Sequence, residues 1–210
     1  MRKHSVHIIK QWGKVLVLAL LLMTSHLLSA QISSADERLL EAYLREDMSV
    51  WQNHIDSFAI YRLPVTPNLL LYEYGYCGYL VDKDKEAAKP YVKRFKQHIE
   101  EVRQNLPVGH YEMWMSAVYV YELRLKESIH PVKAMSMAKE ATKLAPADPF
   151  VLSYYGTCLF YAPKPFGSKA EALEWFEKAE QSFRAPEYRF CWLREATDMY
   201  IRQCHEKLKK

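Results

Sequence analysis

Few residues in this chain have the types and spacing that catalysis or metal binding requires. Cys204 and His205 are adjacent, and a cysteine that finds a proton acceptor on another helix can act as a nucleophile. Neighbours on a helix diverge by about 100°, so we interpret the two as a buried cysteine beside an exposed histidine. Beyond residue 30, none of the other histidines has the spacing of a metal site: His54, His98, His110 and His130. The sequence therefore predicts no catalytic residue, no metal site and no cofactor.

Two basic features could bind anions, and each has a simpler interpretation. Lysines and Arg94 cluster over residues 83–96, interleaved with acidic residues. A solvated helix face explains this alternation, and a site for an anionic partner is the alternative. Gly167-Ser168-Lys169 has part of a phosphate-binding loop but lacks the earlier glycine and the preceding strand. Because Glu171 follows three residues after Ser168, we predict a helix cap there.

Small residues recur at helical spacing between residues 131 and 185 and predict antiparallel helices in close contact. Helix axes approach to about 8–10 Å only where small side chains face each other. The pattern is carried by Ala134, Ala138, Ala141, Leu152, Tyr155, Gly156, Ala172, Phe176 and Ala179. It resembles the tetratricopeptide repeat (TPR) superfamily, closely over residues 131–185 and more loosely over 67–95, where Gly75 and Ala87 take equivalent positions.

The resemblance implies a binding role, because TPR arrays present a concave groove lined by the first helix of each pair. With Gly75 and Gly156 at the family's eighth position, the groove residues would be Tyr72, Tyr76, Tyr79, Tyr119, Phe150, Phe160 and Tyr161. Tyrosine combines broad apolar contact with a polar tip, as surfaces for peptides or sugars do. The alternative, which we favour, is that an apolar stripe from Leu40 to Phe58 fills the groove and makes these rings core.

The rest of the chain is predicted to be helical. No segment alternates with period two, so we predict an all-α, right-handed array of TPR-like helix pairs. Residues 31–66 form an N-terminal segment whose helix could run unbroken from 35 to 61, residues 67–185 form the pairs, and Pro186 begins a capping helix over 186–210. Free buried cysteines are expected, with a Cys158–Cys191 disulfide as the alternative.

Residues 1–30 have the composition of a secretory signal peptide. A basic start is followed by an apolar run from Val15 to Met23 and by Ser29-Ala30. The run is shorter than the roughly 20 residues that span a bilayer. We predict cleavage after Ala30; an uncleaved anchor is the alternative, because Leu28 stands where a small residue is preferred. This segment holds four of the 29 basic residues and none of the 25 acidic ones, so its loss brings the net charge from +4 to zero. A neutral exported chain argues against nucleic-acid binding.

Together these features predict an exported, non-catalytic TPR-like protein that mediates protein–protein interaction in the bacterial cell envelope. We expect it in the periplasm, with secretion as the alternative, and without stable membrane insertion after cleavage. The expected partner is a protein or peptide. Two other functions stay open: a small-ligand, glycan or peptide binder that uses the tyrosine-lined groove, and an enzyme whose site is assembled from scattered residues.

Overall fold

Every regular element that the structure describes is helical. The computed structural model describes residues 35–127 and 131–209, and within these ranges it contains no strand. Residues 35–44 are helical and are followed by α2 (Met48–Ile60), α3 (Pro67–Lys83), α4 (Lys85–Glu101), α5 (His110–Arg124), α6 (Pro131–Leu144), α7 (Pro149–Tyr161), α8 (Lys169–Phe183) and α9 (Trp192–Leu208). Two short 3-10 turns, η1 (Arg103–Asn105) and η2 (Pro186–Tyr188), complete the order. The predicted all-α class is confirmed, whereas the signal segment 1–30 and His130 lie outside the described residues.

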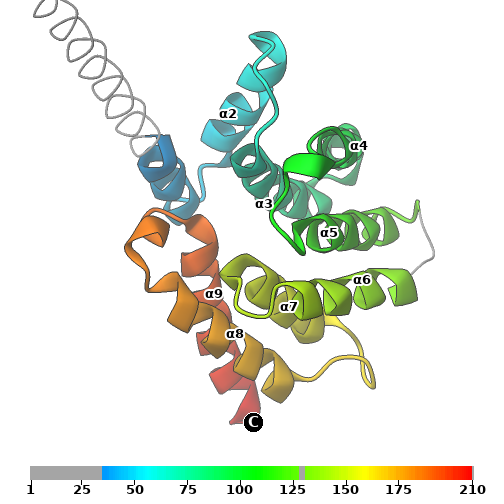
Figure 1. The fold of residues 1–210 in the computed structure, drawn as a ribbon, viewed down its shortest axis with the longest axis vertical. Helices are drawn as coiled ribbons and strands as arrows, with labels where there is room; N and C mark the ends of the chain where they lie inside the picture. Colours follow the sequence, from blue (N-terminus) through cyan, green and yellow to red (C-terminus); the bar gives the residue numbers. More distant parts are fainter. Residues whose placement is uncertain (1–34, 128–130, 210) are drawn as a thin grey trace, which may run out of the picture.

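Consecutive helices pack side by side as neighbouring pairs, α3 with α4, α5 with α6, and α7 with α8, and α9 packs on α8 (Figure 1). Local capping decides where several of them begin. Thr66 Oγ1 accepts the N–H of Leu69 at 3.2 Å, and Ser168 Oγ accepts the N–H of Glu171 at 3.2 Å. Such caps satisfy backbone donors that the first turn of a helix leaves free. The cap predicted at Ser168 is confirmed.

The α7–α8 pair is held together by small residues at its crossing. Gly156 lies against the ring of Phe176, so that a Cβ built on Gly156 would be 2.8 Å from two ring carbons. Ala172 and Ala179 are fully buried on α8, while Ala134 is buried on α6 and Ala87 is partly buried on α4. A glycine at the crossing lets an aromatic ring fill the contact between two backbones.

We expect Gly156→Ala to lower the free energy of unfolding. Overpacking against a fixed ring costs about 1–3 kcal/mol, from which a helix-propensity gain of roughly 1 kcal/mol is subtracted. Gly78→Ala is the matched control, because its Cβ would meet only the Tyr121 side chain, at 3.2 Å from the hydroxyl. Urea melts should therefore show Gly156→Ala less stable than Gly78→Ala. Equal midpoints would contradict a close crossing at Gly156.

The structure corrects both ends of the predicted array. The helix predicted over 35–61 is broken, because Glu46 adopts a positive φ of 58° and Asp47 caps a new helix, accepting the N–H of Ser49 at 3.3 Å. At the other end, Pro186 begins a 3-10 turn, and the last helix starts at Trp192. Pro90 lies inside α4, which runs from Lys85 to Glu101, and is on the exposed side of that helix.

Candidate functional site

Three of the rings predicted for the groove lie in the core. Tyr72, Tyr76 and Phe160 each expose less than a twentieth of their surface. Tyr72 is covered from the N-terminal side, where Trp51 of α2 meets it edge-on at 5.3 Å between ring centroids and Asp36 accepts its hydroxyl at 2.6 Å. Burial, and then this hydrogen bond, raises the pKa of Tyr72 far above its usual value. The N-terminal helices therefore lie over this part of α3.

Tyr76 is covered by a ring of the neighbouring helix. Tyr91 of α4 meets it edge-on at 5.0 Å, and Tyr79 stacks beside it at 6.2 Å. The Tyr91 hydroxyl donates to Asp56 of α2 at 3.0 Å. The Tyr76 ring thus belongs to the packing between α3 and α4.

The remaining predicted rings reach the surface to different degrees. Tyr79 is 38% exposed and Tyr161 is 66% exposed, whereas Tyr119 and Phe150 are partly buried. Two lysines flank Tyr119: the ammonium nitrogen of Lys133 lies 4.5 Å from its ring centroid and that of Lys96 lies 5.9 Å away. The rings predicted for one groove are therefore divided between the core and separate parts of the surface.

A buried ionic cluster joins α2, α3 and α4, and sequence reasoning missed it. Glu73 is 2% exposed, and its carboxylate lies 3.4 Å from Arg94 Nε and 3.0 Å from His98 Nδ1. Arg94 also pairs with Asp56, at 2.9 Å. A buried carboxylate must be paired to avoid a large desolvation cost. Glu73 stands in an apolar stretch of α3. A charged residue in such a stretch was the one sequence signal that could have indicated a buried ion pair.

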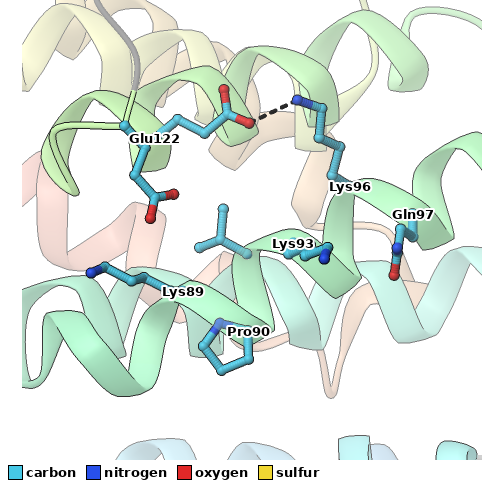
Figure 2. Close-up of a pocket in the computed structure, with 8 residues that line it drawn as sticks. Lys89, Pro90, Lys93, Lys96, Gln97 and Glu122 are labelled. Carbon is cyan, nitrogen blue, oxygen red and sulfur yellow. Dashed lines mark hydrogen bonds and ion pairs between the residues drawn. The ribbon is translucent and has the colours of Figure 1, made fainter.

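A pocket of about 520 Å³ lies between α4 and the end of α5 (Figure 2). Lys89, Lys93 and Lys96 of α4 line one wall, and Glu122 of α5 faces them and accepts a hydrogen bond from Lys96 at 2.8 Å. Lys89 is likewise paired, with Glu86 at 2.7 Å. The basic cluster noted in the sequence is therefore divided: Lys89, Lys93 and Lys96 line this wall, whereas Arg94 belongs to the buried ionic cluster. Carboxylates pair with two of the three lysines in the wall.

Aromatic rings gather where α7 ends and α9 passes. Tyr161 meets Phe160 edge-on at 5.1 Å and Tyr200 edge-on at 6.0 Å, and its hydroxyl lies 3.3 Å from that of Tyr200. Tyr200 in turn stacks on Phe176 at 5.1 Å. Burial, followed by the Tyr161 hydrogen bond, raises the pKa of Tyr200. We call Phe160, Tyr161 and Tyr200 the C-terminal aromatic cluster; Tyr161 is its exposed member.

The cysteines are free thiols in the described chain, and no group of three histidine, cysteine or acidic side chains within it could hold a metal ion. Burial raises the pKa of Cys158 to about 12 and that of Cys191 to about 11. Both thiols therefore stay protonated at neutral pH, when they are poor nucleophiles. Cys204 is buried and His205 is exposed, as their neighbouring helix positions predict.

His110 and Asp148 tie the start of α5 to the start of α7. His110 Nε2 lies 3.0 Å from Asp148 Oδ2, while Asp148 Oδ1 accepts the N–H groups of Phe150 and Val151. Burial alone would raise the pKa of Asp148, but the His110 contact and these N–H groups together lower it below its usual value. The arrangement stabilises the ionised carboxylate at a helix N-terminus.

Asp148→Asn should lower stability at neutral pH by about 0.5–1 kcal/mol, because asparagine keeps the cap but loses the charge. A lowered folded-state pKa gives stability that is present above the unfolded value of roughly 3.9 and is lost as pH falls through the folded value. Urea melts of parent and variant should thus differ at pH 7, and the difference should shrink as the pH falls below the unfolded value. A difference that stays constant as the pH is lowered from 7 to 2 would contradict this assignment.

Comparison with known proteins identifies a likeness of fold. The chain is similar to the solved structure of the HusA haemophore from Porphyromonas gingivalis, with a TM-score of 0.64 and 14% identity over 83% of this chain and 93% of that chain. No family model matches the sequence, and no curated protein does. Within the described residues, no helix has the length and apolar character needed to cross a membrane. The architecture described above is therefore shared with a haemophore.

Proposed function

We propose that this chain is an exported binding protein of TPR-like architecture, without a catalytic role, that takes a planar aromatic ligand at the C-terminal aromatic cluster. Haem is the first ligand to test, because the protein with the similar fold is named a haemophore. Export is supported by the signal-like composition of residues 1–30. The TPR-like assignment is supported by the neighbouring helix pairs and by Gly156 at the α7–α8 crossing.

The observation that carries the proposal is the state of Tyr161. Its side chain is 66% exposed, yet two ring contacts and a hydroxyl contact with Tyr200 hold it in place. A large ring that is exposed and already ordered loses little conformational entropy when a ligand stacks on it. Aromatic side chains of this kind are typical anchors of binding sites.

Tyr161→Ala should weaken haem binding by about 2 kcal/mol or more, which corresponds to roughly a thirtyfold higher Kd. Because the side chain is mostly exposed, the melting temperature should change little. Titration of the purified protein with haem, followed by the change in haem absorbance, measures the Kd.

Tyr61→Ala is the matched control, since Tyr61 is 72% exposed at the end of α2. It should bind haem as the parent does. The proposal fails if the parent does not bind haem, or if the two variants lose affinity equally.

A protein partner is the second candidate function, and a different surface favours it. Ile60, Tyr61 and Leu63 are exposed together at the end of α2. Clustered apolar side chains on a surface mark interaction sites more often than isolated ones do. Partner capture from the cell envelope should then be weakened by Tyr61→Ala and unaffected by Tyr161→Ala, the reverse of the result expected for haem.

A further inference from the structure

Two lysines from distant parts of the chain meet over one ring of the C-terminal aromatic cluster. The Lys169 ammonium lies 3.9 Å from the Phe160 ring centroid, and the Lys207 ammonium lies 4.8 Å from it. Lys169 is the first residue of α8, and Lys207 is in the last turn of α9. Their positions follow from the packing of α8 against both α7 and α9.

Within the part of the chain that the structure describes, neither of the two positive charges has a carboxylate partner. Among residues 35–127 and 131–209, no ion pair involves Lys169 or Lys207, although Lys143, Lys89 and Lys96 each pair with a glutamate. Burial, and then the nearby Lys207 charge, lowers the pKa of Lys169, while Cys204 acts in the opposite direction. Lys169 is partly buried and Lys207 is exposed, and an anion that contacts both ammonium groups would offset their repulsion.

The backbone adds positive potential at the same place. Lys169 follows the cap Ser168 at the N-terminus of α8, where free N–H groups and the helix dipole favour negative charge. The Phe160 ring attracts both ammonium groups through cation–π interaction. The site therefore has two charged donors, a helix N-terminus and an exposed aromatic neighbour, Tyr161, whose ring centroid lies 5.1 Å from that of Phe160.

We propose that Lys169 and Lys207 bind a carboxylate group of the ligand whose rings stack on Tyr161. This inference rests on the proposed function and narrows the ligand class to aromatic acids. The lysines then determine specificity: they distinguish a ligand with a free carboxylate from the same ligand with that group esterified. Each charge-assisted contact strengthens acid binding by about tenfold.

The first experiment compares an iron-free porphyrin dicarboxylate with its dimethyl ester. Lys169→Gln and Lys207→Gln should each raise the Kd of the acid about tenfold while leaving the Kd of the ester unchanged. Lys178→Gln is the matched control, because Lys178 is on the solvent side of α8 with its ammonium over Trp175 at 4.6 Å. Unchanged acid binding in both variants, or equal losses for acid and ester, would overturn the proposal.

A second measurement keeps the test independent of porphyrin binding. Isophthalate, a small aromatic dicarboxylate, is titrated into the parent protein with isotope-labelled lysines. We expect saturable shifts of the Lys169 and Lys207 side-chain resonances and none at Lys178. If porphyrin fails to bind but isophthalate produces these shifts, the proposed function is wrong and the carboxylate site stands. If isophthalate produces no shift at either lysine, the carboxylate site is wrong whatever the porphyrin result.

Discussion

Trp51→Ala should reduce the free energy of unfolding by about 3–5 kcal/mol, the range for removing a large buried aromatic side chain. Trp51 is fully buried, and its indole N–H donates to the Leu39 carbonyl at 2.8 Å. Its ring meets Tyr72 of α3 at 5.3 Å and Trp192 of α9 at 5.2 Å, both edge-on. The alanine variant would lose contacts to the first and the last helices of the array at once.

Urea melts followed by circular dichroism measure this loss. Trp51→Phe separates the loss of ring packing from the loss of the hydrogen bond, because phenylalanine keeps an aromatic ring but cannot donate to Leu39. Its free energy of unfolding should lie between those of the parent and the alanine variant. Trp175→Ala is the control for loss of a tryptophan, since Trp175 is only partly buried. Equal losses in Trp51→Ala and Trp175→Ala would show that Trp51 does not join the two ends of the array.

Arg94→Met should be comparably severe, at about 3–5 kcal/mol, because it leaves buried carboxylate charge without a permanent counterion. Glu73 would keep only His98, and Asp56 would lose its 2.9 Å contact. Methionine retains the apolar stem of arginine, so the decrease in unfolding free energy results mainly from loss of the guanidinium charge. The measurement is again the urea midpoint at neutral pH.

Lys96→Met is the matched control on the same helix. It removes the same charge and breaks an ion pair of similar length, 2.8 Å to Glu122, but the Lys96 side chain is 42% exposed. Partly exposed pairs contribute about 0–1 kcal/mol. If Arg94→Met and Lys96→Met are equally stable, the buried cluster does not stabilise α2, α3 and α4.

Some helix starts have a local signal in the sequence. Thr66-Pro67 and Asp148-Pro149 place a side-chain acceptor before a proline, and both helices begin at the proline. These signals act within one helical turn, so the sequence alone is sufficient to place the start of such a helix. The break at Glu46 was missed because Arg45-Glu46-Asp47 contains neither glycine nor proline, and a non-glycine residue at positive φ has no strong sequence signature.

The candidate site was less predictable, because exposure depends on which helices cover a ring. Tyr72 and Tyr161 have the same side chain, yet α2 covers the first while the second lies exposed at the last residue of α7. The convergence of Lys169 and Lys207 over Phe160 likewise requires α8 and α9 to be placed in space. Sequence patterns identify such residues as aromatic or basic but not as neighbours.

The contact between Trp51 and Trp192 bears on how this architecture can evolve. In an open solenoid each unit touches only the next, so units can be duplicated or deleted and can unfold one at a time. Here the last helix returns to the first ones, as Figure 1 shows where the start of α9 lies beside residues 35–44. A Cβ on Gly75 would be 2.5 Å from the Trp51 ring and 2.9 Å from the Trp192 ring, so the close contact of these rings requires a glycine on α3. Contacts between the first and last helices that an open solenoid lacks favour unfolding of the described helices together rather than one unit at a time.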